Sequence, residues 1–158
     1  EQYGDLVMTV MRAPSPVWSA NLDRSEIKQL FVDQPAVQGK HSNLANDGKV
    51  HDKLKDIIRV MHDNQIDAPR LAAMLSVQQQ RDRRMAERLL AAPAPAVLIA
   101  GAYHAHKDLG VPLHVQDLTG GPAPLVLVLA QRGATVLAPQ ADFVWFTPVA
   151  APVVASAK

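Results

Sequence analysis

The sequence of 158 residues contains no cysteine. Without a thiol the chain can form no disulfide, no thiolate metal site and no cysteine nucleophile. It also lacks any run of about 18 consecutive apolar residues, so we expect no membrane-spanning helix. A large excess of charge of one sign is absent as well. A formal net charge of +1 argues against nucleic acid or a charged membrane surface as a partner.

Several catalytic and phosphate-binding motifs are absent too. The sequence has no serine nucleophile elbow, no phosphate-cradling glycine loop and no zinc-binding helix motif. No residue is therefore assigned a catalytic role, and a protein that is not an enzyme is favoured. The length and a hydrophobic content of 48% fit one domain with a sizeable core.

Apolar periodicity predicts four helices, at 3–12, 24–31, 49–63 and 67–91. Short apolar runs bounded by turn residues predict strands at 16–21, 96–100, 112–115, 125–129 and 143–146. Such alternation indicates an α/β fold with a mostly parallel sheet. The consecutive helices within about residues 49–91 interrupt the alternation, and we expect them to form a helical insert over the carboxyl edge of the sheet.

Two or three parallel strands from this chain would make only a thin sheet. The chain has no initiator Met and opens on residues typical of a helix, so we expect strands N-terminal to residue 1 to be missing or supplied by another chain. Residues 1–148 are then one α/β domain. Residues 149–158 lack periodicity and are expected to form a poorly ordered tail. The polar residues 33–48 are expected to be a lid or a disordered loop.

Chemically active side chains are densest just after the predicted strand at 96–100. Gly101 permits a sharp exit from that strand. Ligands of open α/β sheets bind beyond the carboxyl ends of strands, so a ligand or catalytic role is favoured for His104 over a structural one. Tyr103 is either a half-buried aromatic or a phenolate ligand. His106 shares a face with His104 only if this segment is extended.

The predicted helix at 67–91 has polar residues on its apolar face. The positions of this stripe are Leu71, Leu75, Gln78, Asp82, Met85 and Leu89. A buried carboxylate without a partner is unfavourable, so Asp82 must have a partner or face a cavity. Arg81 and Arg88 flank the stripe and could supply that partner, whereas Arg83 is expected to be solvated. Gln78, Arg81 and Asp82 either line a ligand site or form a structural network.

Three stretches resemble one protein family. Residues 100–112 (AGAYHAHKDLGVP) resemble the Gly-x-x-His…Gly-Val-Pro signature of ChaN-like proteins, which are bacterial haem-binding lipoproteins of the Tiki superfamily. Residues 78–86 (QQQRDRRMA) are similar to the family's preceding helix motif, and residues 19–24 (SANLDR) to its Ala-Asn-Leu segment. The Gly-Glu-x-His segment of the family's first half is absent, so the chain resembles the C-terminal half of such a protein.

The resemblance implies an α/β fold with a helical insert and a role in the uptake or handling of haem or iron. It also implies a periplasmic location or attachment to the outer membrane, with membrane contact only through a lost lipid anchor. Haem is the implied cofactor and ligand. Because half-proteins and symmetric dimers can build a site at an interface, we expect a homo-oligomer or pairing with the missing N-terminal half.

Under this hypothesis Tyr103 or His104 is the axial ligand of haem iron, and Arg81 or Lys107 lies near the haem propionates. The other residues expected to contribute to the haem site are His106, Asp82 and Gln78. One alternative is a metal-dependent hydrolase of the same superfamily, in which His104 ligates a divalent metal together with Asp82 or with groups from the missing half. Another is a non-catalytic partner domain whose polar stripe is a subunit contact.

Overall fold

The computed structural model describes residues 4–14 and 16–148. Its helices and strands, in chain order, are α1 (Gly4–Arg12), α2 (Arg24–Asp33), the 3₁₀ turn η1 (Leu44–Asn46), α3 (Gly48–Met61), α4 (Ala68–Ala91), α5 (Ala102–Ala105), α6 (Val111–Thr119), β1 (Leu127–Gln131), the 3₁₀ turn η2 (Ala138–Gln140) and β2 (Phe143–Thr147). In this part of the chain no helix combines the length and apolar character needed to cross a membrane. The expected tail, 149–158, lies outside the described residues.

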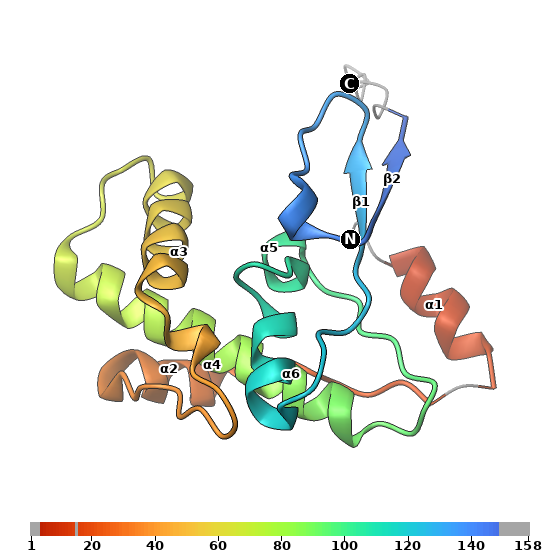
Figure 1. Ribbon diagram of the computed structural model, residues 1–158, viewed down its shortest axis with the longest axis horizontal. Helices are drawn as coiled ribbons and strands as arrows, with labels where there is room; N and C mark the ends of the chain where they lie inside the picture. The colour runs from red at the N-terminus through yellow and green to blue at the C-terminus, as the bar shows by residue number, and fades with distance from the viewer. Residues whose placement is uncertain (1–3, 15, 149–158) are drawn as a thin grey trace, which may run out of the picture.

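The long helix α4 is the element on which the other helices pack. Its N-terminus is capped by Asp67, which accepts a hydrogen bond from the backbone N–H of Arg70, and a proline lies in the first turn. Helices α2, α3 and α6 all contact α4, and they surround it in Figure 1. One half of α4 forms an apolar cluster with α3, and the other half forms a second cluster with α6. The four predicted helices are confirmed, with ends that differ by a few residues.

Strands β1 and β2 pair in parallel and form a two-stranded sheet. Leu127 pairs with Phe143, and Leu129 with Trp145. The α/β class with a parallel sheet is therefore confirmed. Along β1 the alternate side chains Val128 and Ala130 are buried, whereas Leu127 and Leu129 face outward.

The predicted strand at 112–115 is wrong, because these residues lie in helix α6. Pro112 stands in the first turn of that helix, where a missing N–H costs no hydrogen bond. Gly120 ends the helix in the left-handed region, with φ of 69°. Both features are helix boundary signals, and they decide the conformation of an apolar run too short to show a period.

The predicted strands at 16–21 and 96–100 are also wrong, since neither segment pairs with a strand in the described residues. A strand requires a neighbour to complete its backbone hydrogen bonds, and local sequence cannot supply one. Residues 96–100 still alternate. Leu98 and Ala100 pack against the α4–α6 cluster, whereas Val97 and Ile99 are 87% and 56% exposed.

The helical insert also lies elsewhere than expected. The carboxyl ends of β1 and β2 point away from α4, and α5 contacts β1 (Figure 1). Helix α4 instead meets the chain directly after residues 96–100, where His104 contacts Asp82. The polar side chains of α4 contact His104 there, and these contacts position the helical insert.

The polar loop before α3 is held to α6 by one buried carboxylate. Asp117 is fully buried and accepts hydrogen bonds from the Ser42 hydroxyl and from the backbone N–H groups of Leu44 and Ala45, at 3.0 and 3.3 Å. It also lies 3.4 Å from the guanidinium of Arg83. Arg83 was expected to be solvated, but it is only 6% exposed because its charge is compensated there.

A neighbouring buried histidine predicts a pH dependence of stability. Burial lowers the pKa of His114 from 6.5 to about 3, and the charge of Arg83 adds to this effect. Between these values the unfolded chain binds a proton that the folded chain does not. The histidine's contribution to stability is therefore complete above pH 6.5 and falls as the pH drops, by up to about 1.4 kcal/mol per pH unit.

We expect His114→Phe to remove this component. The free energy of unfolding, measured by urea denaturation from pH 7 to pH 4, should fall less steeply for the variant than for the wild-type chain. Parallel curves for the two proteins would contradict the assignment.

Candidate functional site

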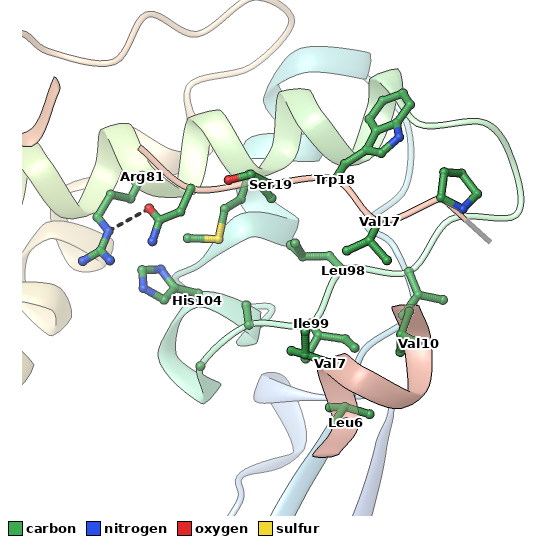
Figure 2. Close-up of a pocket in the computed structure, with 17 residues that line it drawn as sticks. Leu6, Val7, Val10, Val17, Trp18, Ser19, Arg81, Leu98, Ile99 and His104 are labelled. Atoms are coloured by element: carbon green, nitrogen blue, oxygen red, sulfur yellow. Dashed lines mark hydrogen bonds between the residues drawn. The ribbon is translucent and has the colours of Figure 1, made fainter. Parts of the chain in front are cut away.

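A cavity of about 610 Å³ opens between α1, residues 16–21, α4 and residues 97–101. This volume is within the range of about 300–1,000 Å³ that is typical of small-molecule sites. Figure 2 shows Leu6, Val7 and Val10 of α1 on one side and Leu98 and Ile99 beside them. The walls are therefore mainly aliphatic.

One end of the cavity is polar. Arg81 of α4, Asn21 and His104 of α5 line that end. Nε of Arg81 donates a hydrogen bond of 3.1 Å to Oδ1 of Asn21, which holds the guanidinium at the cavity wall (Figure 2). The site thus joins an apolar chamber to one cation and one imidazole.

The imidazole is held from behind by α4. Nδ1 of His104 lies 2.5 Å from Oδ1 of Asp82, and the amide nitrogen of Gln78 lies 3.3 Å from the other carboxylate oxygen. Asp82 is completely buried. Burial raises the pKa of its carboxyl group, and the hydrogen bond and charge of His104 act in the opposite direction. The partner that Asp82 requires is thus chiefly His104, rather than Arg81 or Arg88.

Five of the seven expected site residues do not line the cavity. Gln78 and Asp82 contact His104 from α4, and the other three lie elsewhere. Tyr103 is 46% exposed, and its ring meets that of His106 edge to face at 5.8 Å. His106 is 8% exposed, and burial lowers its pKa. Lys107 forms an ion pair of 2.5 Å with Asp142. Because α5 is helical, successive side chains point in different directions. Of the predicted residues from 103 to 107, His104 alone lines the cavity.

Sequence reasoning missed most of the apolar wall. Leu6, Val7 and Val10 belong to the helix predicted at 3–12 and Trp18 to the strand predicted at 16–21, but neither prediction gives them a ligand, and all four line the cavity. The signal in the sequence is the apolar face of the helix predicted at 3–12, and in the structure no residue of α1 is buried. On α1, Leu6 and Val7 are 42% and 47% exposed. An apolar helix face without a core behind it indicates a cavity or an interface.

Helix α5 is fixed by a close backbone contact at Gly110. A Cβ at this position would lie 2.2 Å from the carbonyl oxygen of His104 and 2.7 Å from that of Tyr103. The φ of Gly110 is −110°, so the requirement for glycine is steric and does not come from the backbone angle. The glycine of the Gly-Val-Pro stretch therefore lets the chain pack against the turn that holds His104.

We expect Gly110→Ala to destabilise the fold by about 1–3 kcal/mol, because the added methyl group must displace backbone atoms. Urea denaturation measures this difference. Gly101→Ala is the matched control, since its Cβ would lie 3.8 Å from Cδ2 of His104, which is an ordinary contact. Equal stability of the two variants would contradict the steric explanation.

No three side chains of His, Asp or Glu gather as a metal site within residues 4–14 and 16–148. By its size and its mainly aliphatic lining, the cavity belongs to the class of small-molecule sites with an apolar chamber and few polar groups.

The sequence also matches the model of one protein family. Residues 1–115 match the family model described as haem-binding uptake, Tiki superfamily, ChaN. This match covers most of the chain, and the chain belongs to that family.

A solved structure shares the fold. It is described as cofacial heme binding to ChaN of Campylobacter jejuni, and it is 31% identical in sequence with a TM-score of 0.80. The match covers 90% of this chain and 55% of that one, so the present chain spans about half the length of its relative. Among proteins with curated descriptions, none matches this sequence.

Proposed function

We propose that this chain binds haem in the cavity beside His104. Haem requires an apolar slot, an axial ligand for iron and cations near its propionates. The observation that carries the proposal is an imidazole, fixed through Nδ1, at the polar end of an aliphatic cavity. Membership of the ChaN family and the haem-bound relative support the same ligand.

The residues present fit this cofactor. His104 is assigned as the iron ligand because it lines the cavity and its Nε2 is opposite the nitrogen that contacts Asp82. Arg81 would pair with a propionate, since only its Nε is used by Asn21. Tyr103 and Lys107 are not assigned to the haem, because neither lines the cavity and Lys107 is already paired with Asp142. Bound iron would supply the redox and ligand chemistry of the group.

We expect His104→Ala to abolish the shift of the Soret band that free haem undergoes on binding, or to weaken binding by at least about tenfold, because the iron loses its protein ligand. Absorption titration of the purified chain with haemin measures this. Tyr103→Phe is the control and should bind as the wild-type chain does. A wild-type affinity in His104→Ala, or a loss confined to Tyr103→Phe, would contradict the assignment.

We further propose a role in bacterial haem or iron uptake, at the outer membrane or in the periplasm. The family's description as haem-binding uptake supports this role. The location and a lipid anchor rest on the resemblance to ChaN-like lipoproteins alone. No observation favours the metal-dependent hydrolase, and we do not propose it.

A second observation supports self-association. On one face of the sheet the large side chains of Leu127, Leu129, Phe143 and Trp145 are 52%, 66%, 59% and 64% exposed. Parallel sheets are normally covered on both faces, and a contiguous apolar patch indicates an interface. We propose that a second copy covers this outer sheet face when the 158-residue chain is in solution.

We expect the chain to sediment as a dimer at micromolar concentration. Trp145→Lys should yield the monomer, because a charge at the interface would be desolvated without a partner. Val32→Lys is the control, since Val32 is 74% exposed on α2, away from the sheet. A monomeric wild-type chain, with or without haem, would refute this association.

A further inference from the structure

The cavity beside α4 combines an aliphatic chamber with one charged end. Side chains of α1 and of the segments 16–21 and 97–101 form the chamber, and they include Leu6, Val7, Val10, Val17, Leu98 and Ile99 (Figure 2). Among the lining residues that the structure describes, Arg81 is the only one with a permanent charge, and none is a carboxylate. The site therefore offers apolar surface to a tail and a single cation to a head group.

The guanidinium of Arg81 is available to a ligand. Its Nε donates to Oδ1 of Asn21 at 3.1 Å, and its two terminal nitrogens have no hydrogen bond or ion pair in the described part of the chain. Their planar arrangement matches the two oxygens of a carboxylate. Asp82 does not neutralise this charge, because its Oδ1 is paired with Nδ1 of His104 at 2.5 Å. The guanidinium is thus oriented by Asn21 and left without a counter-charge.

Asn21 supplies a second donor at the same end. Its Oδ1 accepts hydrogen bonds from Nε of Arg81 and from the backbone N–H of Leu22, at 3.1 and 2.8 Å. Two donors at one atom identify that atom as the amide oxygen. The amide nitrogen keeps both hydrogens, and within residues 4–14 and 16–148 it has no acceptor. An anion at this end would meet donors from Arg81 and from Asn21.

The aliphatic wall is uncovered in the empty chain. Val17 and Ile99 are 55% and 56% exposed, and Leu6 and Val7 of α1 are exposed as well. Covering apolar surface is favourable by an amount that grows with the area removed from water. An aliphatic chain supplies that cover and contains no polar atom that would need a partner there.

We propose that this cavity binds a straight-chain aliphatic carboxylate of the fatty-acid class. The carboxylate pairs with Arg81 and Asn21, and the chain lies against the side chains of α1 and of residues 97–99. The cavity volume of about 610 Å³ suits a ligand of this size class. The inference does not rest on haem binding. Haem is proposed for the same cavity, so the two ligands should exclude each other.

The first experiment separates the head group from the tail. Isothermal titration calorimetry measures the dissociation constants of decanoate and decanol with the wild-type chain and with Arg81→Gln. We expect Arg81→Gln to bind decanoate at least about tenfold more weakly, because a hydrogen-bonded charge pair is lost, and to bind decanol as the wild-type chain does. Arg88→Gln should match the wild-type chain for both ligands, since Arg88 is exposed on the same helix and does not line the cavity. An unchanged affinity of Arg81→Gln for decanoate would overturn the inference.

The second experiment needs no variant. In the wild-type chain the affinities of octanoate, decanoate and dodecanoate should rise by about fourfold for each added CH₂, because each methylene group is removed from water. Decanoate should also bind more tightly than decanol, because only the acid pairs with a cation. Equal affinities for the acid and the alcohol, or affinities that do not depend on chain length, would each contradict the proposed site.

Haemin distinguishes this inference from the proposed function. Titration of the decanoate complex with haemin should release decanoate, because both ligands need one cavity. A chain that binds haemin but no decanoate would refute the fatty-acid site alone. A chain that binds decanoate but no haemin, or both ligands at once, would refute the haem site proposed above and leave the fatty-acid site standing.

Discussion

The hydrogen bond between Asp82 and His104 is the constraint on which the site depends. A carboxylate with no exposure to water is strongly disfavoured unless it is paired, and α4 buries Asp82 completely. The fold therefore needs His104 at this point of α4. Meeting that need links α5 to α4 through the side chain of His104, places the imidazole at the polar end of the cavity and leaves one imidazole nitrogen for a ligand. One interaction thus links packing to the proposed haem site.

A second buried carboxylate, on α6, acts in the same way at another point along α4. Asp117 of α6 pairs with Arg83 and accepts hydrogen bonds from the loop before α3. The helices around α4 are therefore joined by apolar clusters and by two paired carboxylates, each facing a different neighbour. These packed helices contrast with α1 and with the outer face of the two-stranded sheet, where large apolar side chains are exposed. The proposed cavity lies where the two parts meet.

The helices could be predicted because their apolar period and their boundary residues agree, as for α4 with Asp67 and Pro69 at its start. The strands were less predictable. Residues 112–115 are apolar in either conformation, and Pro112 decides for a helix. Residues 96–100 keep the alternation of a strand, yet a strand exists only beside a partner, and pairing depends on distant parts of the chain. Arg83 was expected in solvent for a similar reason, since its partner Asp117 is 34 residues away.

The sequence by itself determined helices α1 to α4, the α/β class, the resemblance to the ChaN family and the need of Asp82 for a partner, because these follow from local patterns and from the cost of burying charge. Only the tertiary structure decided that the partner is His104, and that His104 faces the cavity while Tyr103, His106 and Lys107 do not. The direction of a side chain in a single helical turn depends on how that turn packs, and α5 packs where Gly110 allows its backbone to approach.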